Sequence, residues 1–470
     1  MKGAPLTTLL VALLLPALAQ TVPGDWPAPS EIAPEPIAYQ APEPLHATLS
    51  NGIEVYLLED RSLPLVQGVA YVEAPSAFDP PGLEGLAAIT ATMLREGGTS
   101  QLTPDELDLR LEELAGSVEG ASIDVLASVS FDTLTDTRDE VMGLWRDVLL
   151  EPRFDEGRLQ VLKQRQVEAI RRVVDDPVQL AFREFVRLAY DGHPAGAQPT
   201  EASVAAVGQQ EVRDFYDSYF GPANTVVAVT GDFEAQEMLG ALEGLLGGWQ
   251  NELASPPEVP PVAPPEGSIY LLHRPITQSV VIVGHPAVRA YTPEYNDLDV
   301  ANYVLGGGGF SSRLFEEIRT RRGLAYSTGS ALSQGFDWPG LFYAFTISPA
   351  GETGAVLELL LSEVERLQEQ GVGEEELENA RRSILNASLF RFASPADVTA
   401  RTARVRLLGL DPDYYERYIE NLQTIGADQV REVAREELDL GRAIILVVGD
   451  ASQVAEALEP FGEVETLELE

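Results

Sequence analysis

An internal duplication constrains the fold of this chain more than any other feature. Two apolar, strand-like runs that close with Gly-Asp, NTVVAVTGDF and RAIILVVGDA, lie at 224–233 and 442–451. A polar helical segment of similar character precedes each of them, at 204–220 and 422–438. Because the spacing between such landmarks is nearly constant in the two halves, the pattern predicts two homologous repeats.

Proline-rich segments mark the expected boundaries of these repeats. The run SPPEVPPVAPPEGS ends at Ser268, and prolines at this density exclude a helix or a central strand. We therefore expect an N-terminal domain at 45–250, a linker at 251–268 and a C-terminal domain at 269–470. Residues 20–44 are rich in Pro and Ala and are expected to form an extended leader without a core of its own.

The N-terminus has the features of a secretory signal peptide. Lys2 supplies the positive charge, Leu9 to Leu15 form a short apolar stretch, and Ala17-Leu18-Ala19 is a small-residue cleavage site. The alternative is an uncleaved anchor, but the apolar stretch is short for a bilayer span. We expect residues 1–19 to be removed and the mature chain to be exported, to the periplasm or the extracellular space, with no membrane span.

Composition excludes several classes of function. The chain has 470 residues and no cysteine, which excludes disulfides, thiolate catalysis and zinc–thiolate sites. It carries 74 acidic against 32 basic residues, a formal net charge of −42, so phosphate backbones would be repelled and we expect no nucleic-acid partner. An acidic surface aids solubility. It would also attract basic peptides, although charge alone does not establish that role.

The periodicity of apolar residues changes along each half, which predicts a mixture of helices and strands. Neighbouring strands are arranged as hairpins rather than alternating with helices, so we predict the α+β class, with an antiparallel sheet packed by helices in each repeat. Strands are predicted at 52–60, 66–74, 121–131, 279–285, 327–333 and 341–348. Helices are predicted at 82–97, 154–174 and 352–371, the last ended by Gly371.

One predicted helix carries a family resemblance. The stretch FDPPGLEGLAAITATMLREGGTS, at 78–100, resembles the first catalytic helix of the pitrilysin/insulinase zinc peptidases, which reads G-L-A-H-x-x-E-H-M followed by G-T. In that family the two histidines lie on one helix face and hold a zinc ion, and the glutamate takes a proton from metal-bound water. The frame of the motif is present here as Gly85, Leu86, Ala87, Met93, Gly98 and Thr99.

The working positions of that motif are degenerate in this chain. By the resemblance, the two histidines and the glutamate fall on Ala88, Thr92 and Ala91, none of which supplies a strong zinc ligand or a general base. The family's further glutamate, on a later helix, falls on Ala169. An alignment slip of one residue would place Glu168 there, but a single carboxylate does not hold zinc. We expect no metal and no intact catalytic residue in this chain.

The four histidines offer no replacement site. They are His46, His193, His273 and His285, and no two of them have the i,i+4 spacing of a helical metal site. Both His193 and His285 precede Pro, which indicates a loop or strand end. We interpret them as structural.

The second half retains a longer family signature. Residues 295–332, YNDLDVANYVLGGGGFSSRLFEEIRTRRGLAYSTGSAL, resemble the pattern L-G-G-x-x-S-S-R-L-F…R-x-x-x-G-L-A-Y-S. The resemblance implies that Arg319 and Tyr326 bind substrate, since a guanidinium and a phenol both donate hydrogen bonds to a peptide carbonyl. From the residues alone, Arg319 could instead pair with Glu316, and Tyr326 could be a half-buried strand aromatic.

The glycines at 306–309 have a separate interpretation. No Gly-Lys-Ser/Thr closes this run, so it does not fit a phosphate-binding loop. We expect the glycines to allow a close turn between two helices.

The resemblance implies a non-catalytic subunit of a peptide-degrading or processing complex. Its partner would be a sister chain with an intact H-x-x-E-H motif, which would hold the zinc, and unfolded peptides would bind as added strands on a sheet edge. Two alternatives stay open: a peptide-binding or scaffold protein without a hydrolytic role, and an active metallopeptidase with an unrecognised metal site.

Overall fold

The computed structural model describes residues 42–123, 125–390 and 394–468. The expected signal peptide at 1–19 and nearly all of the expected leader at 20–44 lie outside this part of the chain. Within the described part, no helix is both long and apolar enough to cross a bilayer.

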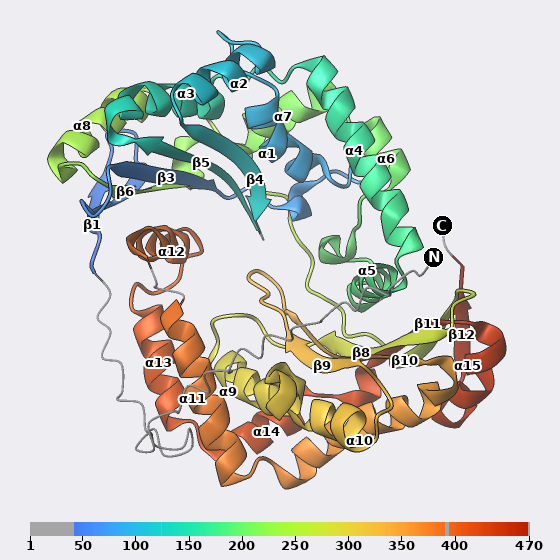
Figure 1. The fold of residues 1–470 in the computed structure, drawn as a ribbon. Coiled ribbons are helices and arrows are strands. Elements are labelled where there is room, and N and C mark those ends of the chain that lie inside the picture. The colour runs from blue at the N-terminus through green and yellow to red at the C-terminus, as the bar shows by residue number, and fades with distance from the viewer. Residues whose placement is uncertain (1–41, 124, 391–393, 469–470) are drawn as a thin grey trace, which may run out of the picture. The chain divides into compact units, whose positions relative to one another are not determined.

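The first half forms a six-stranded mixed sheet in the order β1-β2-β6-β3-β5-β4 (Figure 1). Its strands are β1 (Leu45–Thr48), β2 (Glu54–Glu59), β3 (Leu65–Val72), β4 (Ser117–Ile123), β5 (Leu126–Leu134) and β6 (Thr225–Gly231). Neighbours are antiparallel except β2 and β6, which run parallel. Strand β4 is therefore an outer strand of this sheet.

The second half repeats this topology in the order β12-β7-β11-β8-β10-β9. Its strands are β7 (Ser268–His273), β8 (Gln278–Pro286), β9 (Ser327–Leu332), β10 (Leu341–Pro349), β11 (Ile444–Gly449) and β12 (Val464–Leu467). Five strands correspond one to one with those of the first sheet, including the parallel pair β7 and β11. The predicted α+β class with two repeats is confirmed, with parallel pairs added to the expected antiparallel ones.

Helices flank both sheets. The first half contains α1 (Leu86–Glu96), α2 (Pro104–Glu113), α3 (Arg138–Leu150), α4 (Glu156–Asp175), α5 (Pro177–Ala189), α6 (Glu201–Ala206), α7 (Gln209–Tyr219) and α8 (Ala235–Leu246). The second contains α9 (Pro293–Asn302), α10 (Thr353–Gln370), α11 (Glu374–Phe390), α12 (Pro395–Leu407), α13 (Tyr414–Thr424), α14 (Ala427–Glu437) and α15 (Ala451–Leu458). Residues 251–267, between the last strand of one sheet and the first of the other, lie in neither helix nor strand.

Two predicted segments are divided in the structure. The single helices expected at 204–220 and 422–438 are each two helices, because Gly208 and Gly426 are extended and start a new helix. The Gly208 N–H donates to the Glu211 carboxylate at 3.0 Å, and the Gly426 N–H donates to the Gln429 side chain at 2.8 Å. The two repeats thus share the same break and the same cap, in which the side chain three residues later accepts a hydrogen bond from the glycine N–H.

The strand expected at 121–131 was also wrong as a single element. It contains the end of β4, a turn and the start of β5, which pair as an antiparallel hairpin. Alternating apolar residues continue through the turn, so periodicity alone did not reveal it. Strands β8, β9 and β10 and helix α10, which ends before Gly371 at φ +67, agree with the predictions.

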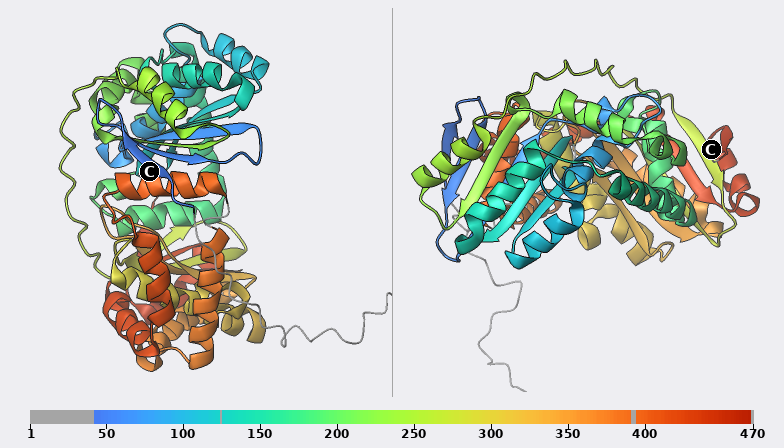
Figure 2. Two further views of the ribbon diagram at one scale, coloured as in Figure 1. Left: turned by 90° about the vertical axis from the view of Figure 1, so that its left-hand side faces the viewer. Right: turned by 90° about the horizontal axis from the view of Figure 1, so that it is seen from above.

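Each half supplies a helix that packs on the sheet of the other half (Figures 1 and 2). Leu180 and Phe185 of α5 pack in one buried cluster with strands of the second sheet. Ala403 of α12 packs in another with Tyr56 and Tyr71 of the first sheet. Each half also has a large hydrophobic core of its own, so these two smaller clusters join the repeats.

Candidate functional site

An aspartate caps the N-terminus of α1, the helix that resembles the family's first catalytic helix. Gly85 adopts φ +101 directly before α1, and the Asp79 carboxylate accepts hydrogen bonds from the N–H groups of Gly85 at 2.8 Å and Ala87 at 2.7 Å. These bonds satisfy donors that a helix start leaves free. Burial raises the pKa of Asp79 to about 6, with backbone hydrogen bonds acting in the opposite direction.

The degenerate positions on α1 lie close to the outer strand β4. Ala91 is fully buried, and a Cβ on Gly120 of β4 would clash with the Ala91 carbonyl oxygen. Ala88 and Thr92 are half-buried. The Thr92 hydroxyl donates to the Ala88 carbonyl at 2.9 Å, within the helix itself. Two methyl groups and an internally bonded hydroxyl do not fit a zinc ion, which takes imidazole, thiolate or carboxylate ligands.

The later helix does not complete such a site. Ala169 is exposed on α4. Its neighbour Glu168 is also exposed and forms an ion pair with Arg171 at 3.3 Å, so an alignment slip would bring in a carboxylate that is already paired. Within the residues that the structure describes, no three His, Cys, Asp or Glu side chains are grouped closely enough to hold a metal ion.

The histidines have local partners. Buried His193 accepts from the Ala195 N–H at 3.0 Å through Nδ1, and its Nε2 lies 2.9 Å from the Pro260 carbonyl. His46 stacks on Tyr56, and His273 accepts from the Ala451 N–H at 3.1 Å. Buried His285 has its Nδ1 2.9 Å from the Pro286 carbonyl.

In the second half, Arg319 and Tyr326 lie together. The Arg319 guanidinium carbon lies 4.5 Å from the ring centre of Tyr326, 4.6 Å from that of Phe315 and 5.5 Å from that of Phe310. We refer to these four residues as the Arg319 cluster. Tyr326 is 80% exposed and Phe310 is 77% exposed. Exposed aromatic side chains that are grouped in this way form a patch, and such patches often mark binding sites.

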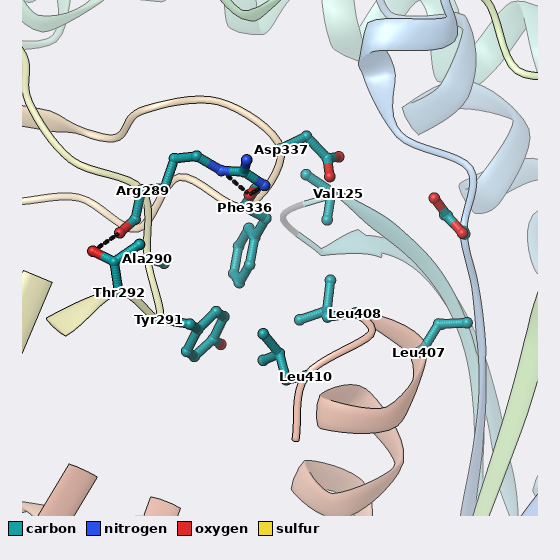
Figure 3. A pocket seen from close by; sticks show the side chains of 11 residues that line it. Val125, Arg289, Ala290, Tyr291, Thr292, Phe336, Asp337, Leu407, Leu408 and Leu410 are labelled. Atoms are coloured by element: carbon teal, nitrogen blue, oxygen red, sulfur yellow. Dashed lines mark hydrogen bonds between the residues drawn. The ribbon is translucent and has the colours of Figure 1, made fainter. Parts of the chain in front are cut away.

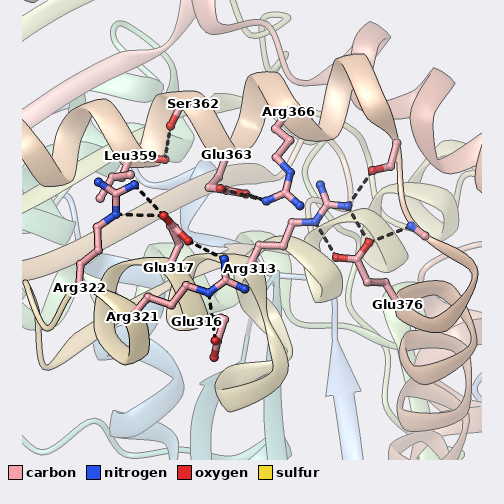
Figure 4. Close-up of polar contacts among 12 residues, drawn as sticks. Arg313, Glu316, Glu317, Arg321, Arg322, Leu359, Ser362, Glu363, Arg366 and Glu376 are labelled. Atoms are coloured by element: carbon pink, nitrogen blue, oxygen red, sulfur yellow. Dashed lines mark hydrogen bonds and ion pairs between the residues drawn. The ribbon is translucent and has the colours of Figure 1, made fainter.

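An ion pair between Arg319 and Glu316 and a half-buried position for Tyr326 within a strand were the alternatives, and neither matches the structure. Glu316 pairs with Arg321 at 3.2 Å, and Glu317 pairs with Arg322 at 2.7 Å (Figure 4). Arg319 has no carboxylate partner among the described residues. Tyr326 is exposed and directly precedes β9, rather than being half-buried within the strand. Arg319 therefore keeps its hydrogen-bonding groups available on an aromatic platform.

A buried ion pair that the sequence did not predict holds the segment carrying the Arg319 cluster. Arg313 is only 9% exposed. It donates through Nε and Nη2 to both oxygens of Glu376, at 2.8 and 2.7 Å, and through Nη2 to the Gly371 carbonyl at 2.8 Å (Figure 4). Residues 315–321 directly after it form a π-helix, a winding often found at functional sites. The sequence signal was the arginine of the S-S-R-L-F signature, a charged residue directly before two large apolar ones.

The glycine run lies at the expected turn between two helical segments, which end at Gly307 and begin at Arg313, and it also packs against a strand. A Cβ on Gly306 would clash with the backbone nitrogen of Ser330 in β9, so glycine is required for this close approach. The expected tight turn is present at Gly309, which has φ +59. The run thus packs the segment leading to the Arg319 cluster against Gly329 and Ser330 of β9, the outer strand of the second sheet.

Comparisons with known proteins agree with this geometry. A family described as "Peptidase M16 inactive domain" matches residues 206–384, a range that includes Arg319 and Tyr326. Residues 206–384 thus resemble the inactive domain of M16 peptidases. The matched region is the part that keeps the second signature and excludes the degenerate helix α1.

Similar proteins are named both as zinc proteases and as non-peptidase homologues. This chain is 22% identical over 404 residues to a Bacillus subtilis protein named "Uncharacterized zinc protease YmxG", covering 85% of this chain and 97% of the relative. It is also 22% identical to the "Non-peptidase homolog YmxG" of Helicobacter pylori, covering 78% of this chain and 84% of the relative.

A solved structure shares the fold. The peptidase M16 inactive domain from Pseudomonas fluorescens superposes with a TM-score of 0.79 at 22% identity, covering 87% of this chain and 98% of that one.

Proposed function

We propose that this chain is a non-catalytic, peptide-binding subunit of a peptide-degrading or processing complex. The observation that carries the proposal is the contrast between the two halves. Ala88, Ala91 and Thr92 present no metal ligand or base. In contrast, half-buried Arg319 lies against the exposed ring of Tyr326 and has no carboxylate partner in the described part of the chain.

The chemistry of the Arg319 cluster suits an extended peptide. A guanidinium packed on three rings has few accessible orientations, so little side-chain entropy is lost when its N–H groups donate to a peptide carbonyl. The Tyr326 hydroxyl adds a second donor beside it. Because the cluster directly precedes outer strand β9, a bound peptide can pair with that strand's free edge.

The partner that this role requires is a sister chain with an intact H-x-x-E-H motif. That chain would hold zinc, whose chemistry is to activate a water molecule for peptide hydrolysis. The present chain would orient the peptide. The alternative is a binding or scaffold role without hydrolysis, which needs the same cluster but no sister chain.

The test is cleavage of an unfolded peptide by the chain, by a zinc-containing M16 chain from the same source, and by both together. We expect activity to require both chains. Arg319→Ala should lower kcat/KM of the pair at least about tenfold, since a donor aimed at a reacting carbonyl contributes about 2 to 4 kcal/mol.

The matched control is Arg431→Ala, which removes an exposed helical arginine paired with Asp428 at 3.0 Å and should leave the rate unchanged. Full activity from the present chain alone would overturn the proposal. Peptide binding that depends on Arg319 but never leads to cleavage would favour the scaffold alternative.

A further inference from the structure

A pocket lies where the outer strands of both sheets end. Strand β4 ends at Ile123 and β9 at Leu332, and the turns that follow them contribute Val125 and Phe336 to one cavity of about 290 Å³. The volume is at the lower end of the range for sites that take small ligands, about 300 Å³. It suits one large side chain rather than a whole cofactor.

The wall of this pocket is largely apolar. The side chains of Tyr291, Phe336, Leu408 and Leu410 converge on the hollow (Figure 3). Tyr291 is held at φ +66, a conformation that bulky residues rarely adopt. Its ring packs edge-on against Tyr414 at 4.4 Å between centres. Strain of this kind persists only where surrounding packing fixes it, and it is often found at ligand sites.

Two carboxylates, Glu73 and Asp337, complete the lining. Neither forms an ion pair with a basic side chain among the described residues. Burial, and secondly the charge of Asp337, raises the pKa of Glu73. The one basic residue of the lining, Arg289, is directed at a neutral group, because its Nε and Nη2 donate to the Phe336 carbonyl at 3.1 and 2.9 Å. The pocket therefore has an uncompensated negative charge above an apolar wall.

This combination matches a side chain that is apolar along its stem and cationic at its tip. A hydrated inorganic cation would gain nothing from the leucines and aromatic rings, and a neutral apolar side chain would leave the two carboxylates unpaired. Arginine and lysine satisfy both parts of the pocket.

We propose that this pocket binds an arginine or lysine side chain of an extended peptide whose backbone lies along β9. The inference rests on the proposed peptide-binding function and adds the class of substrate, a peptide with a basic residue at a fixed position. Strand β9 has 6 residues, so it spans about 20 Å between the Arg319 cluster at one end and the pocket at the other. The basic residue should lie roughly six to eight residues from the one held at Arg319.

The test compares two fluorescent extended peptides that differ only in one arginine and its neutral isostere citrulline, bound to the full chain and followed by anisotropy. We expect the arginine peptide to bind about five- to tenfold more tightly at low salt. Glu73→Gln/Asp337→Asn should remove that difference without weakening the citrulline peptide.

The control variant Glu252→Gln/Glu258→Gln makes the same change in net charge at exposed residues outside helices and strands, and it should keep the difference. Equal affinities of the two peptides for the unaltered chain would overturn the pocket assignment alone. An arginine preference that survives in Glu73→Gln/Asp337→Asn would do the same. Failure of both peptides to bind would overturn the proposed peptide-binding function as well.

Discussion

At the scale of single residues, the two halves differ in what their side chains can do. Ala88 and Ala91 offer only methyl groups, and the Thr92 hydroxyl is bonded within its own helix. Arg319 and Tyr326 instead present donors beside exposed rings. Ala91 of α1 and Gly120 of β4 meet too closely for a larger residue at 120, so this face of α1 serves packing.

Asp79, the cap of α1, gives a residue-scale prediction about pH. Its pKa rises from 3.8 to about 6 on folding, so the folded state binds the proton more tightly. Stability from this group is therefore present at pH 4 and lost as the pH rises through about 6.

Asp79→Asn removes this titration. Relative to the variant, the unaltered chain should lose roughly 1 to 3 kcal/mol of unfolding free energy between pH 4 and pH 7, measured by urea denaturation. If the unaltered chain instead gained unfolding free energy relative to the variant as the pH rose, the α1 N-terminus would stabilise the carboxylate more than burial destabilises it.

At the scale of elements, the segment carrying Arg319 depends on a contact with another helix pair. Arg313 joins the segment to the turn between α10 and α11 through Glu376 and the Gly371 carbonyl. The Arg313 guanidinium lowers the pKa of Glu376. This ion pair is partly open on the Glu376 side, which moderates its contribution.

We predict that Arg313→Met lowers the free energy of unfolding by about 2 to 3 kcal/mol, because it leaves a partly buried carboxylate without its partner. It should also weaken peptide binding by displacing the π-helix. Arg431→Met is the matched exposed change and should cost less than about 0.5 kcal/mol. Equal effects of the two substitutions would show that the buried pair does not hold the segment.

At the scale of the whole molecule, the duplication explains most of the architecture. The sequence predicted two α+β repeats and placed Arg319 and Tyr326 as a pair, because a long motif fixes their spacing. The breaks at Gly208 and Gly426 were readable in principle, since each glycine is followed three residues later by a capping Glu or Gln.

Other features depend on contacts between distant segments and had no sequence signal. The packing of α12 on the first sheet joins residues far apart in the chain, as in the hydrogen bond between Thr230 and Thr399 at 2.8 Å. The same holds for the pocket proposed to bind an arginine or lysine side chain, because Glu73, Asp337 and Leu408 in its wall come from three separate segments. Only the tertiary fold brings such residues together.

We propose that this chain holds no catalytic metal, and the zinc content of the purified protein tests this proposal. The purified full chain would be incubated with excess zinc, separated from free metal by gel filtration and analysed by mass spectrometry. We predict less than about 0.1 zinc per chain, because tight sites need three or more clustered ligands. A value near one zinc per chain would contradict the account and support an active metallopeptidase.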